Sequence, residues 1–185
     1  MYAEERGHSR GGAGKGILTR TGAWFALLLV ILPAGCARER EDPLPPRLGE
    51  VSLARRLDGE AAGTIVDRMH GKGVAPLRSM IGFYGDDEGA GAVLYVSVYG
   101  ESVDASVADG KMRDGITRGG GVFSSFAEYV VAGRRISGCD GMGLRHYFFA
   151  AGKEIYWIAA PKEKAFSLAQ ELAQRLADRD AVSRR

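Results

Sequence analysis

Glycine clusters divide most of this chain into short segments, and this feature restricts the possible folds more than any other. The chain has 27 glycines among 185 residues, about twice the usual share. They gather at 85–91, 119–121 and 138–143, with single glycines at 133 and 152. They keep no period of three, which excludes a collagen-like chain. Because glycine ends helices and strands, the segments between the clusters are expected to be short elements joined by tight turns.

Several of these segments have the composition of β-strands. Residues 77–84 and 92–99 are rich in β-branched and aromatic side chains, and a polar glycine turn separates them as in a hairpin. The region 122–160 divides at its glycines into three or four further strands. The clearest are 144–150 and 154–160, which a tight turn joins. Neighbouring strands with short turns predict an antiparallel sheet.

Three segments have the periodicity of helices. Residues 58–70 place apolar side chains at intervals of four, after a good N-cap at Asp58. Pro161 suits the first turn of a final helix that ends before a charged tail.

The middle helix begins at Ser102 and ends at the glycines of 119–121. Its apolar residues predict the stripe that faces the sheet, and they are Val103, Val107, Met112 and Ile116.

Together these elements predict a single α+β domain. We expect an antiparallel sheet of about five to six strands packed with three helices on one main face. This arrangement is similar to the two-layer folds of the Mog1/PsbP-like group, with a ferredoxin-like sandwich as the alternative. Such a likeness concerns the fold and implies no function.

The N-terminal region has the pattern of an export signal. Lys15 and Arg20 precede an apolar run at 23–32. This run has 10 residues, whereas a helix that spans a bilayer needs about 20. Small residues and Cys36 follow it, as in a secretory signal peptide.

The residues Ala34-Gly35-Cys36 resemble the lipobox of bacterial lipoproteins. The resemblance implies that Cys36 is lipidated on its sulfur and that residues 1–35 are removed. The protein would then be anchored in the bacterial cell envelope, with its domain facing the periplasm or the exterior. An ordinary secretory signal and an uncleaved anchor remain as alternatives.

This interpretation divides the chain into four parts. Residues 1–35 form the signal peptide, and 36–50 form a tether rich in proline and charge. Residues 51–180 form the α+β domain, and 181–185 form a disordered tail.

Removal of the signal peptide changes the charge balance. The whole chain has 25 basic and 23 acidic side chains, and residues 1–35 contain four basic and two acidic ones. The processed chain therefore has 21 of each and no net charge. Nucleic-acid binding loses its electrostatic basis, so no nucleic-acid partner is expected.

Three residues near the third glycine cluster are candidates for redox or metal chemistry. Cys139 has no predicted disulfide partner once Cys36 is lipidated, so it is a buried inert thiol, a reactive thiol or half of an intermolecular bridge. Met142 and His146 lie close to it and are ligand types for copper or haem. Their spacing matches no established motif, so we predict no cofactor and no catalytic residue.

Aromatic side chains on the strands provide the clearest indication of a binding surface. Because side chains alternate along a strand, about half of them point away from the core. Aromatics on both faces mean either that helices cover both faces or that one face carries an exposed apolar patch. The candidate surface residues are Tyr95, Tyr99, Tyr147, Phe149 and Trp157.

These observations favour a lipid-anchored envelope protein whose domain binds a partner protein or a small ligand without catalysis. One alternative is an envelope enzyme, redox factor or metal factor that uses Cys139 and His146. Another is an assembly accessory that acts through an edge strand of its sheet.

Overall fold

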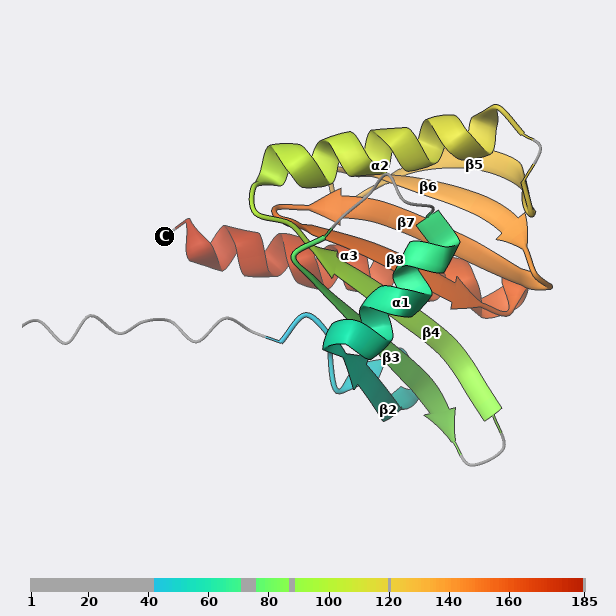
Figure 1. The fold of residues 1–185 in the computed structure, drawn as a ribbon. Coiled ribbons are helices and arrows are strands. Elements are labelled where there is room, and N and C mark those ends of the chain that lie inside the picture. The colour runs from blue at the N-terminus through green and yellow to red at the C-terminus, as the bar shows by residue number, and fades with distance from the viewer. Residues whose placement is uncertain (1–41, 71–75, 87–88, 120, 185) are drawn as a thin grey trace, which may run out of the picture. The chain divides into compact units, whose positions relative to one another are not determined.

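The structure is a computed structural model that describes residues 42–70, 76–86, 89–119 and 121–184 (Figure 1). The elements in chain order are β1 (Arg47–Leu48), β2 (Val51–Asp58), α1 (Gly59–His70), β3 (Arg78–Asp86), β4 (Gly89–Val98), α2 (Ser102–Thr117), β5 (Phe123–Val131), β6 (Arg134–Gly141), β7 (Leu144–Ala151), β8 (Glu154–Ala160) and α3 (Lys162–Ser183). The three predicted helices and both predicted hairpins are confirmed.

The described strands form one antiparallel sheet of eight, in the order β1-β2-β3-β4-β8-β7-β6-β5. The prediction of five to six strands is wrong, because residues 47–58 add two strands and 122–160 contain four. Strands adjacent in the chain pair with each other except where β4 pairs with β8. Helix α2 makes this crossover and lies against β5, β7 and β8 (Figure 1).

Helices lie on both faces of the sheet, so the expected two-layer arrangement is also wrong. In Figure 1, α1 and α2 lie in front of the sheet and α3 lies behind it. The physical reason is visible in β7, where the consecutive residues Phe148 and Phe149 point to opposite faces and are both fully buried. Each face therefore needs its own apolar cover.

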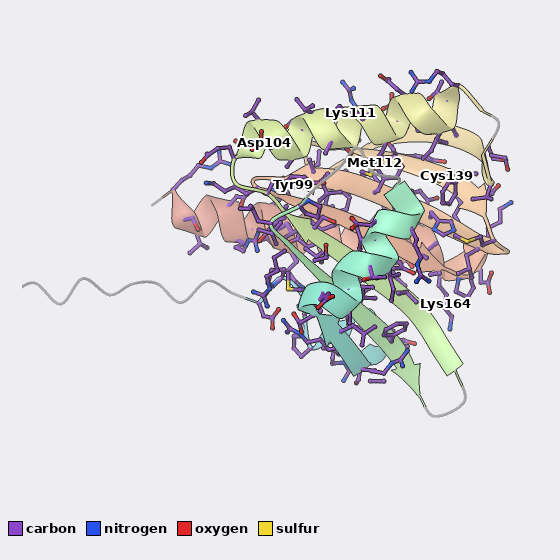
Figure 2. The ribbon with its side chains drawn as sticks, viewed as in Figure 1. Tyr99, Asp104, Lys111, Met112, Cys139 and Lys164 are labelled. Atoms are coloured by element: carbon purple, nitrogen blue, oxygen red, sulfur yellow. The ribbon has the colours of Figure 1, made fainter. Side chains whose placement is uncertain are left out.

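The core between α2 and the sheet is compact and rich in aromatic rings. Figure 2 labels Tyr99, Met112 and Cys139 below α2. The rings of Phe148 and Trp157 stack there with centroids 4.7 Å apart. The helix contributes Ala105, Ala108 and Met112, whereas the stacked rings come from the strands.

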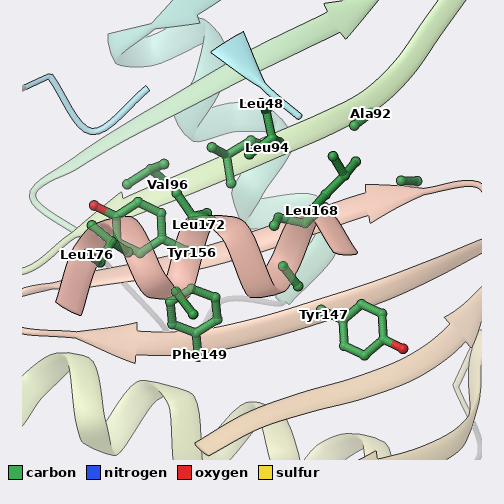
Figure 3. Packing of buried hydrophobic residues seen from close by; sticks show 14 of the residues in the cluster. Leu48, Ala92, Leu94, Val96, Tyr147, Phe149, Tyr156, Leu168, Leu172 and Leu176 are labelled. Carbon is green, nitrogen blue, oxygen red and sulfur yellow. The ribbon is translucent and has the colours of Figure 1, made fainter. Parts of the chain in front are cut away.

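The larger core lies between α3 and the opposite face of the sheet (Figure 3). Leu168, Leu172 and Leu176 recur at intervals of four along α3 and pack over Phe149 and Tyr156. This face matches the apolar periodicity that predicted the final helix.

The folded unit extends beyond the boundaries expected from the sequence. The sequence predicts a tether over 36–50, but Leu44 and Leu48 within it are buried and β1 pairs with β2. The Tyr84 hydroxyl donates to the Pro45 carbonyl over 2.9 Å and fixes this segment on the sheet. At the other end α3 continues through Ser183, into the expected tail.

Within the described ranges, none of the helices has the length and apolar composition of a membrane span. The apolar run at 23–32 and Cys36 lie outside those ranges.

Candidate functional site

Helix α2 buries one charged residue on its inner face and exposes two valines on its outer face, which is unusual for a helix that covers a core. Its buried positions are Ala105, Ala108, Asp109 and Met112. Two of its valines face away from the sheet, with Val103 64% and Val107 52% exposed. Of the predicted stripe, only Met112 and Ile116 pack against the sheet. Asp109 occupies an inner position that an apolar residue would normally hold, and it is only 4% exposed.

The buried Asp109 belongs to a charged group between α2 and the strands β5 and β6. Arg113, one turn further along α2, forms an ion pair with Asp109 and a second one with Glu128 on β5 over 3.4 Å. Ser137 on β6 pairs across the strands with Glu128 and shares its face of the sheet. Neither Asp109 Oδ1 nor the Ser137 hydroxyl has a hydrogen-bond partner in the described residues.

Burial changes the acid–base behaviour of Asp109. Removal from water raises the pKa of its carboxyl to about 6, although the charge of Arg113 acts in the opposite direction. The carboxylate is therefore ionised near neutral pH at a cost in folding free energy. Strongly shifted carboxyls gather at functional sites, although structural ion pairs shift them as well.

His146 lies deeper in the same core, and both of its ring nitrogens are occupied. The Trp157 indole N–H donates to His146 Nδ1 over 2.9 Å. Because the indole can only donate, Nδ1 accepts and the proton lies on Nε2, which donates to the Gly141 carbonyl over 2.9 Å. Burial lowers the pKa of His146 and favours the neutral ring. This histidine serves the packing of β7 and β8, and neither nitrogen is left to bind a metal.

The other two candidates for redox or metal chemistry, Cys139 and Met142, differ in their exposure to solvent. Cys139 lies opposite His146 in the β6–β7 ladder and is fully buried. Burial raises the pKa of its thiol to about 11, which suppresses the reactive thiolate. Met142 lies in the β6–β7 turn and is 63% exposed. Within the described residues, no three His, Cys, Asp or Glu side chains gather as metal ligands.

The five candidate surface aromatics do not form an exposed patch. Tyr99, Tyr147, Phe149 and Trp157 are buried, and Tyr95 is half-buried against the core under α2. They are also divided between the two faces of the sheet. Of the two possibilities open for a sheet with aromatics on both faces, the structure has the one with helices on both. The prediction of an exposed aromatic surface is therefore wrong, and these side chains pack in the core.

One surface that is open for binding is the outer face of α2, which we define as Val103, Asp104, Val107, Gly110 and Lys111. These residues recur along one side of the helix, at intervals of one and two turns. A Cβ atom added at Gly110 would meet nothing within 4 Å, so another chain can approach the helix closely there. The defined face has an apolar centre with one acidic and one basic side chain, and Asp114, one turn beyond Gly110, adds a second exposed carboxylate next to it.

Sequence reasoning missed both parts of this site, although a signal was present. Asp109 follows Ala105 by four residues and precedes Met112 by three, the spacing of one helix face. Val103 and Val107 share a different face, because the step from Val107 to Met112 is five residues. The helix could thus have been divided into an inner face that contains a carboxylate and an outer face that contains valines.

Comparison with protein-family models, with curated proteins and with solved structures finds no match to this chain.

Proposed function

We propose that this chain is a lipid-anchored protein of the bacterial cell envelope, whose domain binds a protein partner through the outer face of α2 and catalyses no reaction. The observation that carries the proposal is that both valines of α2 are exposed while an aspartate of the same helix is buried. Apolar residues gathered on an exposed face are typical of an interaction surface.

The anchor is supported by the sequence around Cys36 and by the short distance in the chain from Cys36 to the domain. Leu44 is buried in the domain and lies only eight positions after Cys36. Eight residues of fully extended chain reach about 28 Å. A lipid on Cys36 would therefore hold the domain close to the membrane surface and to other anchored proteins.

We expect Cys36→Ser to release the full chain from the membrane fraction and to abolish the lipid mass on the processed protein. Two or more acyl chains are needed for stable anchoring, and this cysteine would carry them. Membrane fractionation and intact-mass spectrometry measure both effects. Cys139→Ala is the matched control and should retain the anchor, because Cys139 is buried within the domain. Continued membrane association of Cys36→Ser would refute the anchor.

We expect Val107→Asn to change the free energy of unfolding by less than about 0.5 kcal/mol, as for surface positions in general. Valine and asparagine have similar helix propensities, and about half of the surface of Val107 is exposed to solvent. Met112→Asn, on the buried face of the same helix, should lower it by about 2–4 kcal/mol. Urea unfolding measures both. A loss above about 1 kcal/mol in Val107→Asn would show that the domain itself uses this valine, and the outer face would then need no partner.

A further inference from the structure

Two of the charged residues on the outer side of α2, Asp104 and Lys111, are placed symmetrically about Val107. Asp104 and Lys111 are both exposed and lie seven residues apart, so they share one flank of the helix two turns from each other. Val107 lies between them. Lys111 forms no ion pair within the described residues, and Asp104 uses its Oδ2 atom to accept the Glu101 backbone N–H over 3.2 Å.

This pattern is self-complementary for two antiparallel copies of the helix. A twofold axis through the outer face, midway between residues 107 and 108, places each charged residue about 5 Å from the axis along the helix. Asp104 of one copy then faces Lys111 of the other, twice, and the two Val107 side chains meet at the centre. Val103 comes within about 3 Å, along the helix, of the level of Gly110 of the other copy, where the helix surface is open. A parallel arrangement would instead place each charged residue level with its own counterpart, so that no Asp104 would face a Lys111.

We propose that the outer face of α2 binds the same face of a second copy of this chain, in an antiparallel pair with two Asp104–Lys111 ion pairs around Val107. The inference rests on the proposed function and names the partner of that surface. Closed twofold pairing is the commonest form of self-association, and it requires a self-complementary patch of this kind.

The contact is too small for a tight dimer in solution, so we expect the pairing to depend on the membrane anchor. Helix α2 has 16 residues and is about 24 Å long. A single helix pair of this length buries less than the area of about 1,200 Å² that stable interfaces need. Anchoring both copies in one membrane raises their effective concentration, as linking two binding modules does. The pair is therefore expected in the membrane and not in dilute solution.

The test is disulfide cross-linking of the full chain in membranes through Val107→Cys. Across the twofold axis the two introduced cysteines face each other, so mild oxidation is expected to give a dimer. The unmodified chain, which contains only Cys36 and Cys139, is the control and should give none. Absence of the dimer overturns the proposal. A cross-linked product of another mass identifies a different protein as the occupant and also overturns it.

Charge reversal in the Val107→Cys background tests the ion pairs. Asp104→Lys alone and Lys111→Glu alone should each lower the dimer yield about tenfold, which corresponds to about 1.4 kcal/mol. The double reversal should restore the yield to within about twofold. Lys164→Glu, an exposed reversal on α3, is the matched control and should have no effect. Unchanged single variants, or a double variant that stays low, would overturn the paired arrangement.

A separate measurement keeps this inference apart from the proposed function. Cys36→Ser combined with Val107→Cys should lose the dimer together with its membrane association. If the protein stays with the membrane, the anchor proposal fails whatever the charge variants do. If it is released and still forms the dimer at full yield, the anchor stands but the dependence of pairing on the membrane is refuted.

Discussion

Replacement of Trp157 by alanine is expected to lower the free energy of unfolding by about 3–5 kcal/mol, the usual range for a large buried ring. Trp157 is only 3% exposed, and its ring stacks on Phe148 with centroids 4.7 Å apart. Helix α2 covers this core with Ala105, Ala108 and Met112, none of which has the volume of the lost indole. Urea unfolding followed by circular dichroism measures the loss. A change below about 1 kcal/mol would contradict the packing described for this face.

Trp157→Phe separates the ring from its hydrogen bond. Phenylalanine retains most of the apolar area but cannot donate to His146 Nδ1, which then stays buried without this partner. Leaving a buried acceptor unpaired costs about 1–3 kcal/mol, so the phenylalanine variant should lie between wild type and the alanine variant. A phenylalanine variant as stable as wild type would show that the indole–imidazole bond contributes nothing to stability.

The glycine-bounded strands could be predicted because local pattern and tertiary role agree in them. Residues 92–99 and 154–160 have strong β-strand composition, and they pair with each other as β4 and β8. That pairing joins segments far apart in the chain. No local sequence pattern predicts the pairing of β4 with β8, because this pairing depends on where α2 places β5.

The first two strands could not be predicted because they form through contacts made elsewhere in the fold. Residues 51–58 combine alternating apolar positions with adjacent arginines, and β1 is only two residues long. The proline-rich segment before β2 is held by the burial of Leu44 and Leu48 and by the hydroxyl of Tyr84. Tertiary packing thus overrides a composition that is typical of a spacer.

The candidate site was missed for a different reason, since the rule applied to α2 assumed that apolar residues face the core. That assumption holds for Met112 and Ile116 and fails for the two valines. Departures from local rules are most common where a protein binds or reacts, so this failure is itself informative. The exposure of the two valines in the structure, and not their sequence pattern, makes the outer face of α2 a candidate site.

The burial of Asp109 leads to the second large prediction. The pKa of its carboxyl is about 6 in the folded protein and near 3.8 in the unfolded chain. Because the folded value is the higher one, the folded state gains from protonation below about pH 4. This gain is lost as the pH rises through about 6. Asp109 therefore destabilises the fold at neutral pH, since its charge is held away from water.

We expect Asp109→Asn to stabilise the protein, and to do so more strongly at neutral than at acid pH. Over the range from about pH 4.5 to about pH 7.5, its advantage over wild type should grow by about 2 kcal/mol, at about 1.4 kcal/mol per unit of pH up to the folded pKa. Arg113 keeps its second ion pair, with Glu128, and is not left unpaired. The burial of His146 lowers its pKa and gives stability the opposite pH dependence. That contribution cancels when variant and wild type are compared at the same pH.

Urea unfolding at both pH values measures the difference, with Asp114→Asn as the matched control. Asp114 lies on the exposed side of the same helix, so its replacement should have an effect within about 0.5 kcal/mol that is the same at both pH values. If the advantage of Asp109→Asn does not change with pH, Asp109 is not a strained buried carboxylate. If it grows as expected, the chain retains a charge on the inner face of α2 that lowers its own stability, which is the behaviour of a residue kept for function and not for folding.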